Sequence, residues 1–166
     1  MKINEVADQE CRVILTRASI GRLGCSLNDQ PYVVPVYFAY EPDYIYVFST
    51  VGQKIEWMRK NPKVCMQVDE ISHESQWVSV IVNGTYQELP AHSESSELRH
   101  AQKLLEKRQR WWLNPIAGRR AKVDDLSIDT VFFRIRVLSM NGLRAQGRPR
   151  RRPALTEWRQ PQGRVR

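Results

Sequence analysis

The fold is decided by residues 21–69, which read GRLGCSLNDQPYVVPVYFAYEPDYIYVFSTVGQKIEWMRKNPKVCMQVD. Short stretches rich in β-branched and aromatic residues alternate here with polar turns, a pattern typical of antiparallel strands joined by hairpins. A short helix is predicted over residues 52–62, because the ring of Pro62 disfavours a helical conformation at Asn61. The predicted strands are residues 21–27, 32–40, 44–50 and 63–69, and the predicted turns are residues 27–31 and 41–43.

Two further strands are predicted on the C-terminal side of this stretch. Residues 77–89 form a long apolar run, and residues 131–140 alternate between apolar and charged side chains, with Phe133 and Ile135 opposite Arg134. Strands that follow one another with short connections favour an antiparallel barrel over a doubly wound parallel sheet. The sequence therefore predicts a mostly β fold, a β-barrel with peripheral helices.

Apolar residues at three- and four-residue steps predict two more helices outside the decisive stretch. The first is expected from Ile3 to Ala18. The second begins near residues 93–96 and has one apolar face and a serine as its N-terminal cap. Its apolar residues are Leu98, Ala101, Leu104 and Leu105, and the candidate caps are Ser93, Ser95 and Ser96.

The positive charge of the chain is concentrated at its C-terminus. The 166 residues carry a net charge of +8, and residues 144–166 alone hold eight Arg against one acidic residue, Glu157. We expect one folded domain over residues 1–145, followed by a basic tail over residues 146–166 with too few apolar residues to fold. The folded domain is nearly neutral and so lacks the charge pattern of a nucleic-acid-binding surface.

Cysteine usage and the N-terminal residues predict a cytoplasmic protein. The three cysteines are odd in number and contain no CxxC pair, which is typical of a reducing compartment, and we expect them to be small core residues. The polar N-terminus lacks the apolar segment of a signal peptide, and no apolar run approaches the roughly 20 residues of a membrane span.

Residues for hydrolysis or metal binding are not apparent in the sequence. No GxGxxG, GxxxxGK[ST], HExxH or GxSxG motif is present, and His73, His92 and His100 lack ligand spacing and are predicted to lie on the surface. The acidic pairs Asp69–Glu70 and Asp124–Asp125 are interpreted as turn or cap residues. A bound cofactor would therefore have to supply any reactivity.

One stretch gathers the groups that bind a phosphate. A predicted strand ends in Ser49 and Thr50, Gly52 allows close approach, and Lys54 lies in the first turn of the following helix. Hydroxyl groups, free N–H groups, the positive end of a helix and an ammonium group would meet at one point. The alternative remains open that Ser49 or Thr50 only caps the helix and that Lys54 is solvated.

Residues 21–145 resemble the pyridoxamine 5′-phosphate oxidase-like split-barrel flavoproteins, and most closely the branch that contains the nitroimidazole reductases. The resemblance rests on blocks in matching order: GRL, PYVVPV, SxxGxK before a helix ending NPKV, WVSVIVNG, and FRIRV followed by Asn141–Gly142. It implies a split, antiparallel, Greek-key-like barrel that binds FMN at a homodimer interface.

The resemblance also implies which residues hold the FMN. Three residues of the second strand would pack along the isoalloxazine ring, four residues would hold the phosphate, and two residues of the partner chain would close the ring site. In that order these are Pro35, Val36 and Tyr37; Ser49, Thr50, Gln53 and Lys54; and Trp77 and Ser79.

The resemblance implies an FMN-dependent oxidoreductase that passes electrons from NAD(P)H or a similar donor to a nitro-aromatic or quinone-like acceptor. Phe48 stands where nitroimidazole reductases often carry His, and the C-terminal ALTEWRQPQGRVR lacks the substrate-binding block of the vitamin B6 oxidases. Two alternatives remain open: a non-catalytic flavin- or haem-binding sensor of the same fold, and an adaptor that binds nucleic acid or a membrane surface through its Arg-rich tail.

Overall fold

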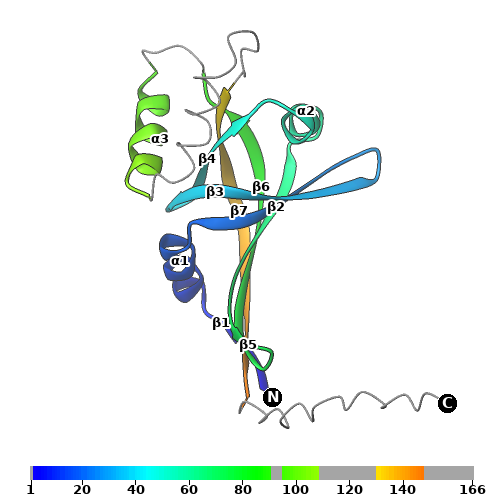
Figure 1. The fold of residues 1–166 in the computed structure, drawn as a ribbon, viewed down its shortest axis with the longest axis vertical. Coiled ribbons are helices and arrows are strands. Elements are labelled where there is room, and N and C mark those ends of the chain that lie inside the picture. Colours follow the sequence, from blue (N-terminus) through cyan, green and yellow to red (C-terminus); the bar gives the residue numbers. More distant parts are fainter. Residues whose placement is uncertain (1, 91–94, 109–129, 148–166) are drawn as a thin grey trace, which may run out of the picture.

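The computed structural model describes residues 2–90, 95–108 and 130–147, which form an antiparallel β-barrel with three helices on its outside (Figure 1). In the described residues no helix is long and apolar enough to cross a membrane. The strands are β1 (Lys2–Val6), β2 (Ile20–Leu27), β3 (Gln30–Glu41), β4 (Tyr44–Thr50), β5 (Lys63–His73), β6 (Gln76–Glu88) and β7 (Thr130–Gln146), and the helices are α1 (Asp8–Arg17), α2 (Gln53–Lys60) and α3 (Ser96–Glu106).

The strands pair in the order β1-β7-β4-β3-β2-β5-β6, and β6 also pairs with β7, which closes the sheet into a barrel. All pairings are antiparallel. Three hairpin-connected strands, β2 to β4, are followed by β5, which returns beside β2, and this order is a Greek key. The predicted fold class, a mostly β barrel with Greek-key order and peripheral helices, is confirmed.

The barrel is split where β3 and β4 separate. β4 pairs with β3 only at residues 38–41, whereas residues 30–37 of β3 pair with β2 alone. The Phe38 N–H donates to the Ser19 carbonyl on the β2 side, and backbone groups alternate between the two edges of a strand. Pro31 and Pro35 therefore direct their ring nitrogens toward the split, where a missing N–H breaks no sheet hydrogen bond.

Alternation along the strands gives the barrel an inner and an outer face. The inner face holds the apolar core, which includes Leu23, Phe38, Met66, Val80 and Phe133. On β2, β3, β5, β6 and β7, the residues between the core residues point to the outer face, where residues paired across neighbouring strands lie side by side. One row across these five strands consists of Pro35, Arg22, Gln67, Ile81 and Asn141.

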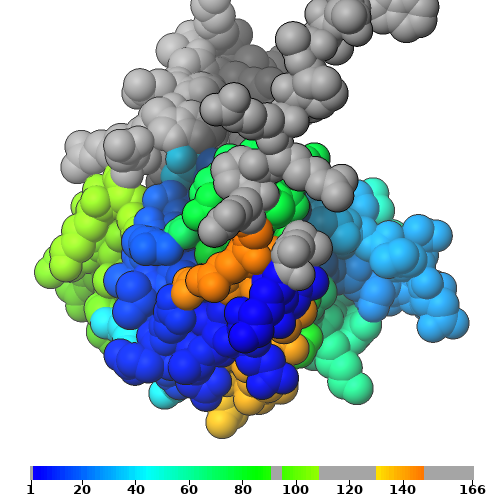
Figure 2. Space-filling model, turned by 90° about the horizontal axis from the view of Figure 1, so that it is seen from below, coloured from blue at the N-terminus to red at the C-terminus, as the bar shows by residue number. Residues whose placement is uncertain are grey.

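The helices cover the remaining surfaces. α3 packs on β4 through Tyr46, Leu89 and Ala101, and the Ser95 hydroxyl accepts a hydrogen bond from the Leu98 N–H, so one of the three candidate caps is confirmed. Figures 1 and 2 show α3 on the opposite side of the barrel from the projecting β2–β3 hairpin. In Figure 2 the N-terminal strand lies beside the C-terminal end of β7, with which it pairs.

The predicted N-terminal helix over residues 3–18 is wrong in its first part. Lys2–Val6 is a strand that pairs with Gly142–Gln146 of β7, and α1 begins only at Asp8. Pairing with β7 satisfies the backbone of this segment and buries Val6 against the core. A five-residue segment can match a helical and an extended pattern equally well, and here the tertiary pairing decides between them.

Two smaller expectations are also wrong. Cys65 is exposed on the outer face of β5, although Cys11 and Cys25 are buried as expected. Asp69 and Glu70 lie within β5 rather than in a turn, and they form ion pairs with Arg22 and Arg17 respectively. The Asp124–Asp125 pair, His92 and residues 148–166 of the basic tail lie outside the described residues.

Candidate functional site

The first group of candidate residues surrounds the start of α2, which we call the α2 start (Ser49 to Lys54). Gly52 precedes the helix and offers no side-chain cap, and the first helical hydrogen bonds run from the Ile55 and Glu56 N–H groups to the Gly52 carbonyl. The N–H groups of the first helical residues therefore have no hydrogen-bond acceptor within the helix. Among the described residues, no side chain caps the positive end of α2.

Lys54 adds a cation at this position. Its side chain is partly buried toward β2, and this burial lowers the pKa of Lys54, whereas nearby Cys25 has the smaller, opposite effect. Within the described ranges, Lys54 has no carboxylate as an ion-pair partner. A cation at a helix N-terminus is unfavourable by itself, so an anion bound between the two would stabilise both.

The other predicted phosphate residues lie at the same place but differ in orientation. Ser49 is buried, and its hydroxyl donates to the Thr50 carbonyl at 3.0 Å. Thr50 is half-buried at the end of β4, and Gln53 is exposed in the first turn of α2. The α2 start thus combines one hydroxyl already bonded to the backbone with a neighbouring hydroxyl, a carboxamide and an ammonium.

The three predicted ring-binding residues lie on β3 beside the split, but not on one face. Pro35 is exposed on the outer face and Tyr37 is half-buried there, whereas Val36 points into the core. Only the backbone of Val36 could contact a ligand outside the barrel. α2 packs against the inner side of the neighbouring hairpin, where the Trp57 and Tyr32 rings lie 5.7 Å apart, so the body of α2 lies beside the hairpin end of β3.

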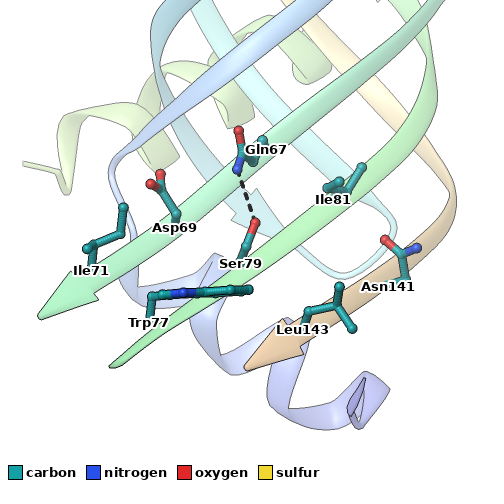
Figure 3. A pocket seen from close by; sticks show the side chains of 8 residues that line it. All are labelled: Gln67, Asp69, Ile71, Trp77, Ser79, Ile81, Asn141 and Leu143. Carbon is teal, nitrogen blue, oxygen red and sulfur yellow. Dashed lines mark hydrogen bonds between the residues drawn. The ribbon is translucent and has the colours of Figure 1, made fainter. Parts of the chain in front are cut away.

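The two residues expected from the partner chain, Trp77 and Ser79, lie on β6 and line a hollow of about 360 Å³ (Figure 3). We call it the outer hollow. It is formed by outward-pointing side chains that lie next to one another on β5, β6 and β7. The Gln67 side-chain amide donates a hydrogen bond to the Ser79 hydroxyl at 3.1 Å. Its lining residues are Gln67, Asp69, Ile71, Trp77, Ser79, Ile81, Asn141 and Leu143.

The sequence assigned only Trp77 and Ser79 of these residues to a site, and the roles of the others in the hollow were missed. The alternation of Trp77, Ser79 and Ile81 along β6 carried a signal, since all three point outward. Gln67 and Leu143, however, join them only through the pairing register of β5 and β7 with β6. No spacing in the sequence of one strand reveals that register.

Within one chain, the outer hollow lies far from the split. β2 and β5 separate Pro35 on β3 from Ile81 on β6, and Trp77 lies four residues further along that strand. At about 4.8 Å between strands and about 3.4 Å per residue, Trp77 is roughly 20 Å from Pro35 along the sheet. One chain therefore does not bring the two groups of candidate residues together.

These features define a class of protein: an antiparallel split barrel with a cationic, uncapped helix start beside its open edge. Residues 7–144 match the model of the pyridoxamine 5′-phosphate oxidase family, and the chain belongs to this family. An uncharacterised protein of Rhizobium meliloti (strain 1021) is 44% identical over 113 residues, which cover 68% of this chain and 75% of that protein.

Several solved structures share the fold. An FAD-binding protein from Mesorhizobium loti is 41% identical, with a TM-score of 0.71 over 88% of this chain and 100% of its own. A candidate 5-nitroimidazole antibiotic resistance protein from Bacteroides thetaiotaomicron is 22% identical, with a TM-score of 0.61 over 88% and 92% of the two chains. An FAD-binding protein from Mycobacterium smegmatis is 19% identical, with a TM-score of 0.62 over 86% and 100%.

Proposed function

We propose that this chain binds a flavin nucleotide and passes electrons through it to a small acceptor. The observation that carries the proposal is the α2 start, where a partly buried Lys54 without a carboxylate partner among the described residues meets an uncapped helix N-terminus. The similar Mesorhizobium loti structure is named as an FAD-binding protein, and FMN and FAD share the flavin-side phosphate. FMN remains the ligand that we expect first.

The α2 start fits a phosphate group. A Cβ added at Gly52 would meet no heavy atom of the described residues within 4 Å, so these residues leave room for a ligand in front of the helix. Lys54 would pair with the phosphate charge, and the N–H groups of the first turn would donate to its oxygens. Thr50 and Gln53 supply further polar groups, whereas the Ser49 hydroxyl would have to leave the Thr50 carbonyl to take part.

The split edge of β3 fits the flavin ring. Pro35 presents an apolar ring on the outer face, and the Pro35 carbonyl points toward the split, where β4 no longer pairs. A planar ring with polar edges can pack on such a surface and accept or donate hydrogen bonds along the strand. When bound, a flavin can take up two electrons from a donor and pass them on to an acceptor.

A homodimer would bring the two groups of candidate residues together. The outer face exposes several apolar side chains, including Ile71 (68% exposed), Ile81 (42%) and Leu143 (46%), and clustered exposed apolar side chains are typical of an interaction surface. The partner's outer hollow, placed over the split, would bring Trp77 and Ser79 to the ring. This arrangement accounts for their roughly 20 Å separation from Pro35 within one chain.

Ligand binding tests the first half of the proposal. The purified protein is titrated with FMN, FAD and riboflavin, and binding is followed by flavin fluorescence. We expect FMN and FAD to bind at least about tenfold more tightly than riboflavin, because a charge-assisted hydrogen bond to phosphate contributes roughly 1.5–3 kcal/mol. Equal affinities for FMN and riboflavin would contradict the phosphate site.

Turnover tests the second half. The flavin-loaded protein is mixed anaerobically with NADH or NADPH, and then with a quinone or a nitro-aromatic compound. We expect the flavin absorbance to bleach with the donor and to return with the acceptor. A protein that binds flavin but is neither reduced nor reoxidised would be a binding module rather than an oxidoreductase.

A further inference from the structure

The two ends of α2 are attached to the barrel in different ways. Near the C-terminal end, the Arg59 guanidinium donates two hydrogen bonds to the Glu88 carboxylate of β6, at 2.8 and 2.7 Å. Directly after the helix, the Asn61 side-chain amide donates to the Ser26 carbonyl of β2 at 2.9 Å. At the N-terminal end, by contrast, no described side chain caps the helix. These polar side-chain bonds between α2 and the barrel are therefore concentrated at its C-terminal end.

The acceptor of the Arg59 bonds is itself fixed by the core. The Tyr86 hydroxyl donates to Glu88 at 2.8 Å, and the Tyr86 ring is buried and contacts the Phe133 ring at a centroid distance of 5.1 Å. The hydrogen bonds from Arg59 lower the pKa of Glu88, so this carboxylate stays charged at neutral pH. A bidentate pair of a guanidinium and a carboxylate fixes direction as well as distance. The C-terminal end of α2 is thus attached to a well-defined point of β6.

α2 is short enough to carry a displacement from one end to the other. It has eight residues and is about 12 Å long. Its buried side chains, Ile55 and Met58, hold it against the core, but apolar contacts are non-directional and define its tilt less well than hydrogen bonds do. A change in tilt of about 10° at the C-terminal end would move the α2 start by roughly 2 Å. A hydrogen bond does not survive a lengthening of about 1 Å, so phosphate contacts at the α2 start depend on the bonds at the other end.

We propose that the Arg59–Glu88 ion pair positions the α2 start for a phosphate-bearing ligand, although Arg59 lies about 7.5 Å further along the helix than Lys54. This inference rests on the proposed function, which assigns the flavin phosphate to the α2 start, and it makes Arg59 and Glu88 positioning residues of that site. The two side chains are 46% and 33% exposed, and ion pairs with such exposure contribute little to stability. Loss of the pair should therefore lower the preference for FMN over riboflavin and leave the unfolding temperature nearly unchanged.

Two variants remove opposite charges and so separate positioning from a direct effect of charge. FMN and riboflavin affinities are measured by flavin fluorescence in wild type, Arg59→Met and Glu88→Gln, below the unfolding temperature of all three. Positioning predicts that both variants lower the ratio of FMN to riboflavin affinity, by about tenfold in Arg59→Met and about threefold in Glu88→Gln, which keeps one acceptor oxygen. A direct effect of charge on the phosphate predicts opposite changes in the two variants, because Glu88→Gln removes a negative charge.

Two further variants complete the comparison. Arg59→Lys keeps the positive charge but cannot form the bidentate pair, and it should lose most of the preference that Arg59→Met loses. Arg134→Met is the matched control, since it removes an ion pair that joins β7 to Glu97 of α3 at 3.0 Å, and it should leave the ratio unchanged. In flavin-free protein, the NMR signal of the Gly52 N–H should shift in Arg59→Met and Glu88→Gln but not in Arg134→Met.

The proposal is overturned if Glu88→Gln raises the ratio or leaves it unchanged, if Arg59→Met leaves it unchanged, or if the Gly52 signal stays in place. A variant that is unfolded at the assay temperature leaves the other one to decide. Equal affinities of wild type for FMN and riboflavin would contradict the proposed phosphate site, and the present proposal with it. A wild-type preference for FMN that survives in both variants would contradict the present proposal alone.

Discussion

The α2 start and the outer hollow differ in how their polar groups are satisfied. At the α2 start, the helix end has no side-chain cap and Lys54 has no carboxylate partner in the described chain. In the outer hollow, Gln67 is bonded to Ser79 and Asp69 to Arg22, and the exposed surface is mainly apolar. One region has an excess of positive charge among the described residues, and the other exposes an apolar surface.

The two regions would therefore be stabilised by different kinds of partner. An anion such as a phosphate would complete the α2 start, since the remaining interactions there are electrostatic. A second protein surface or a flat ring would complete the outer hollow, since the gain there comes from removing apolar area from water. The two regions should therefore respond to different substitutions, and the following experiments separate them.

The largest expected effect is loss of the proposed dimer. Ile81→Lys places a charge in the middle of the outer face, where it would be buried between two chains. We expect a monomer by light scattering at micromolar concentration and a large loss of FMN binding. Val13→Lys, at an equally exposed apolar position on α1, is the matched control and should stay dimeric. A dimer in Ile81→Lys would place the interface elsewhere.

The next effect is on ligand affinity alone. Lys54→Met should weaken FMN binding by about one to two decades and leave riboflavin binding unchanged, because only FMN carries a phosphate. Thermal stability without ligand should stay the same or rise, since burial of the charged ammonium is unfavourable in the absence of an anion. Lys60→Met, at the exposed end of the same helix, is the control. Unaltered FMN affinity in Lys54→Met would disprove the phosphate site.

A smaller effect is expected from pH. Burial lowers the pKa of Lys54, so this side chain loses its proton at a lower pH than an ordinary lysine does. Above that pH the FMN phosphate no longer has a positively charged partner. FMN affinity should therefore fall on the alkaline side, and also on the acidic side where the phosphate takes up its second proton, near pH 6. Riboflavin affinity should show neither decrease, and Lys54→Met should abolish the alkaline one.

The same pKa shift has a consequence for stability without ligand. Between the lowered pKa of folded Lys54 and the ordinary pKa of the unfolded chain, the unfolded state binds more protons. The contribution of Lys54 to the free energy of unfolding should therefore rise with pH through this window. Urea unfolding of wild type and Lys54→Met at two pH values measures it, and identical pH dependence in both proteins would argue against a shifted Lys54.

The smallest effect concerns two glycines. Gly52→Ala should lower FMN affinity only several-fold and leave thermal stability unchanged, because the new Cβ enters open space and the φ angle of 171° is extended backbone. Gly84→Ala should do the opposite, since its Cβ would lie 2.5 Å from the Arg136 carbonyl oxygen. Crowding of that kind costs roughly 1–3 kcal/mol in unfolding free energy. If the two variants changed FMN affinity and thermal stability in the same way, the FMN phosphate would not lie close to Gly52.

Much of the barrel could be predicted from sequence because its signals are local. The two-residue turns at Asn28–Asp29 and Pro42–Asp43, both with residues at positive φ, follow directly from the polar interruptions between strands. The α2 start was equally readable, since its groups lie within six residues of one another. The roles assigned to those residues remain predictions.

The outer hollow and the N-terminal strand could not be predicted, since both depend on long-range pairing. β1 forms a strand because β7 offers it an edge more than 135 residues later in the chain. Asp69 meets Arg22 only because β5 returns beside β2. Hydrophobic periodicity reports on one segment at a time, and it therefore cannot show which faces of distant strands adjoin.

The prolines of β3 also affect how the protein avoids self-association through its backbone. An open strand edge is a template to which an unfolded or misfolded chain can add another strand, and this is a route to aggregation. Pro31 and Pro35 interrupt the row of donors along the split edge, so an invading strand would find alternate hydrogen bonds missing. Pro35→Val would restore one donor at this edge and should make the protein aggregate faster on heating. The opening beside the proposed ligand site can thus persist without acting as a seed for fibres.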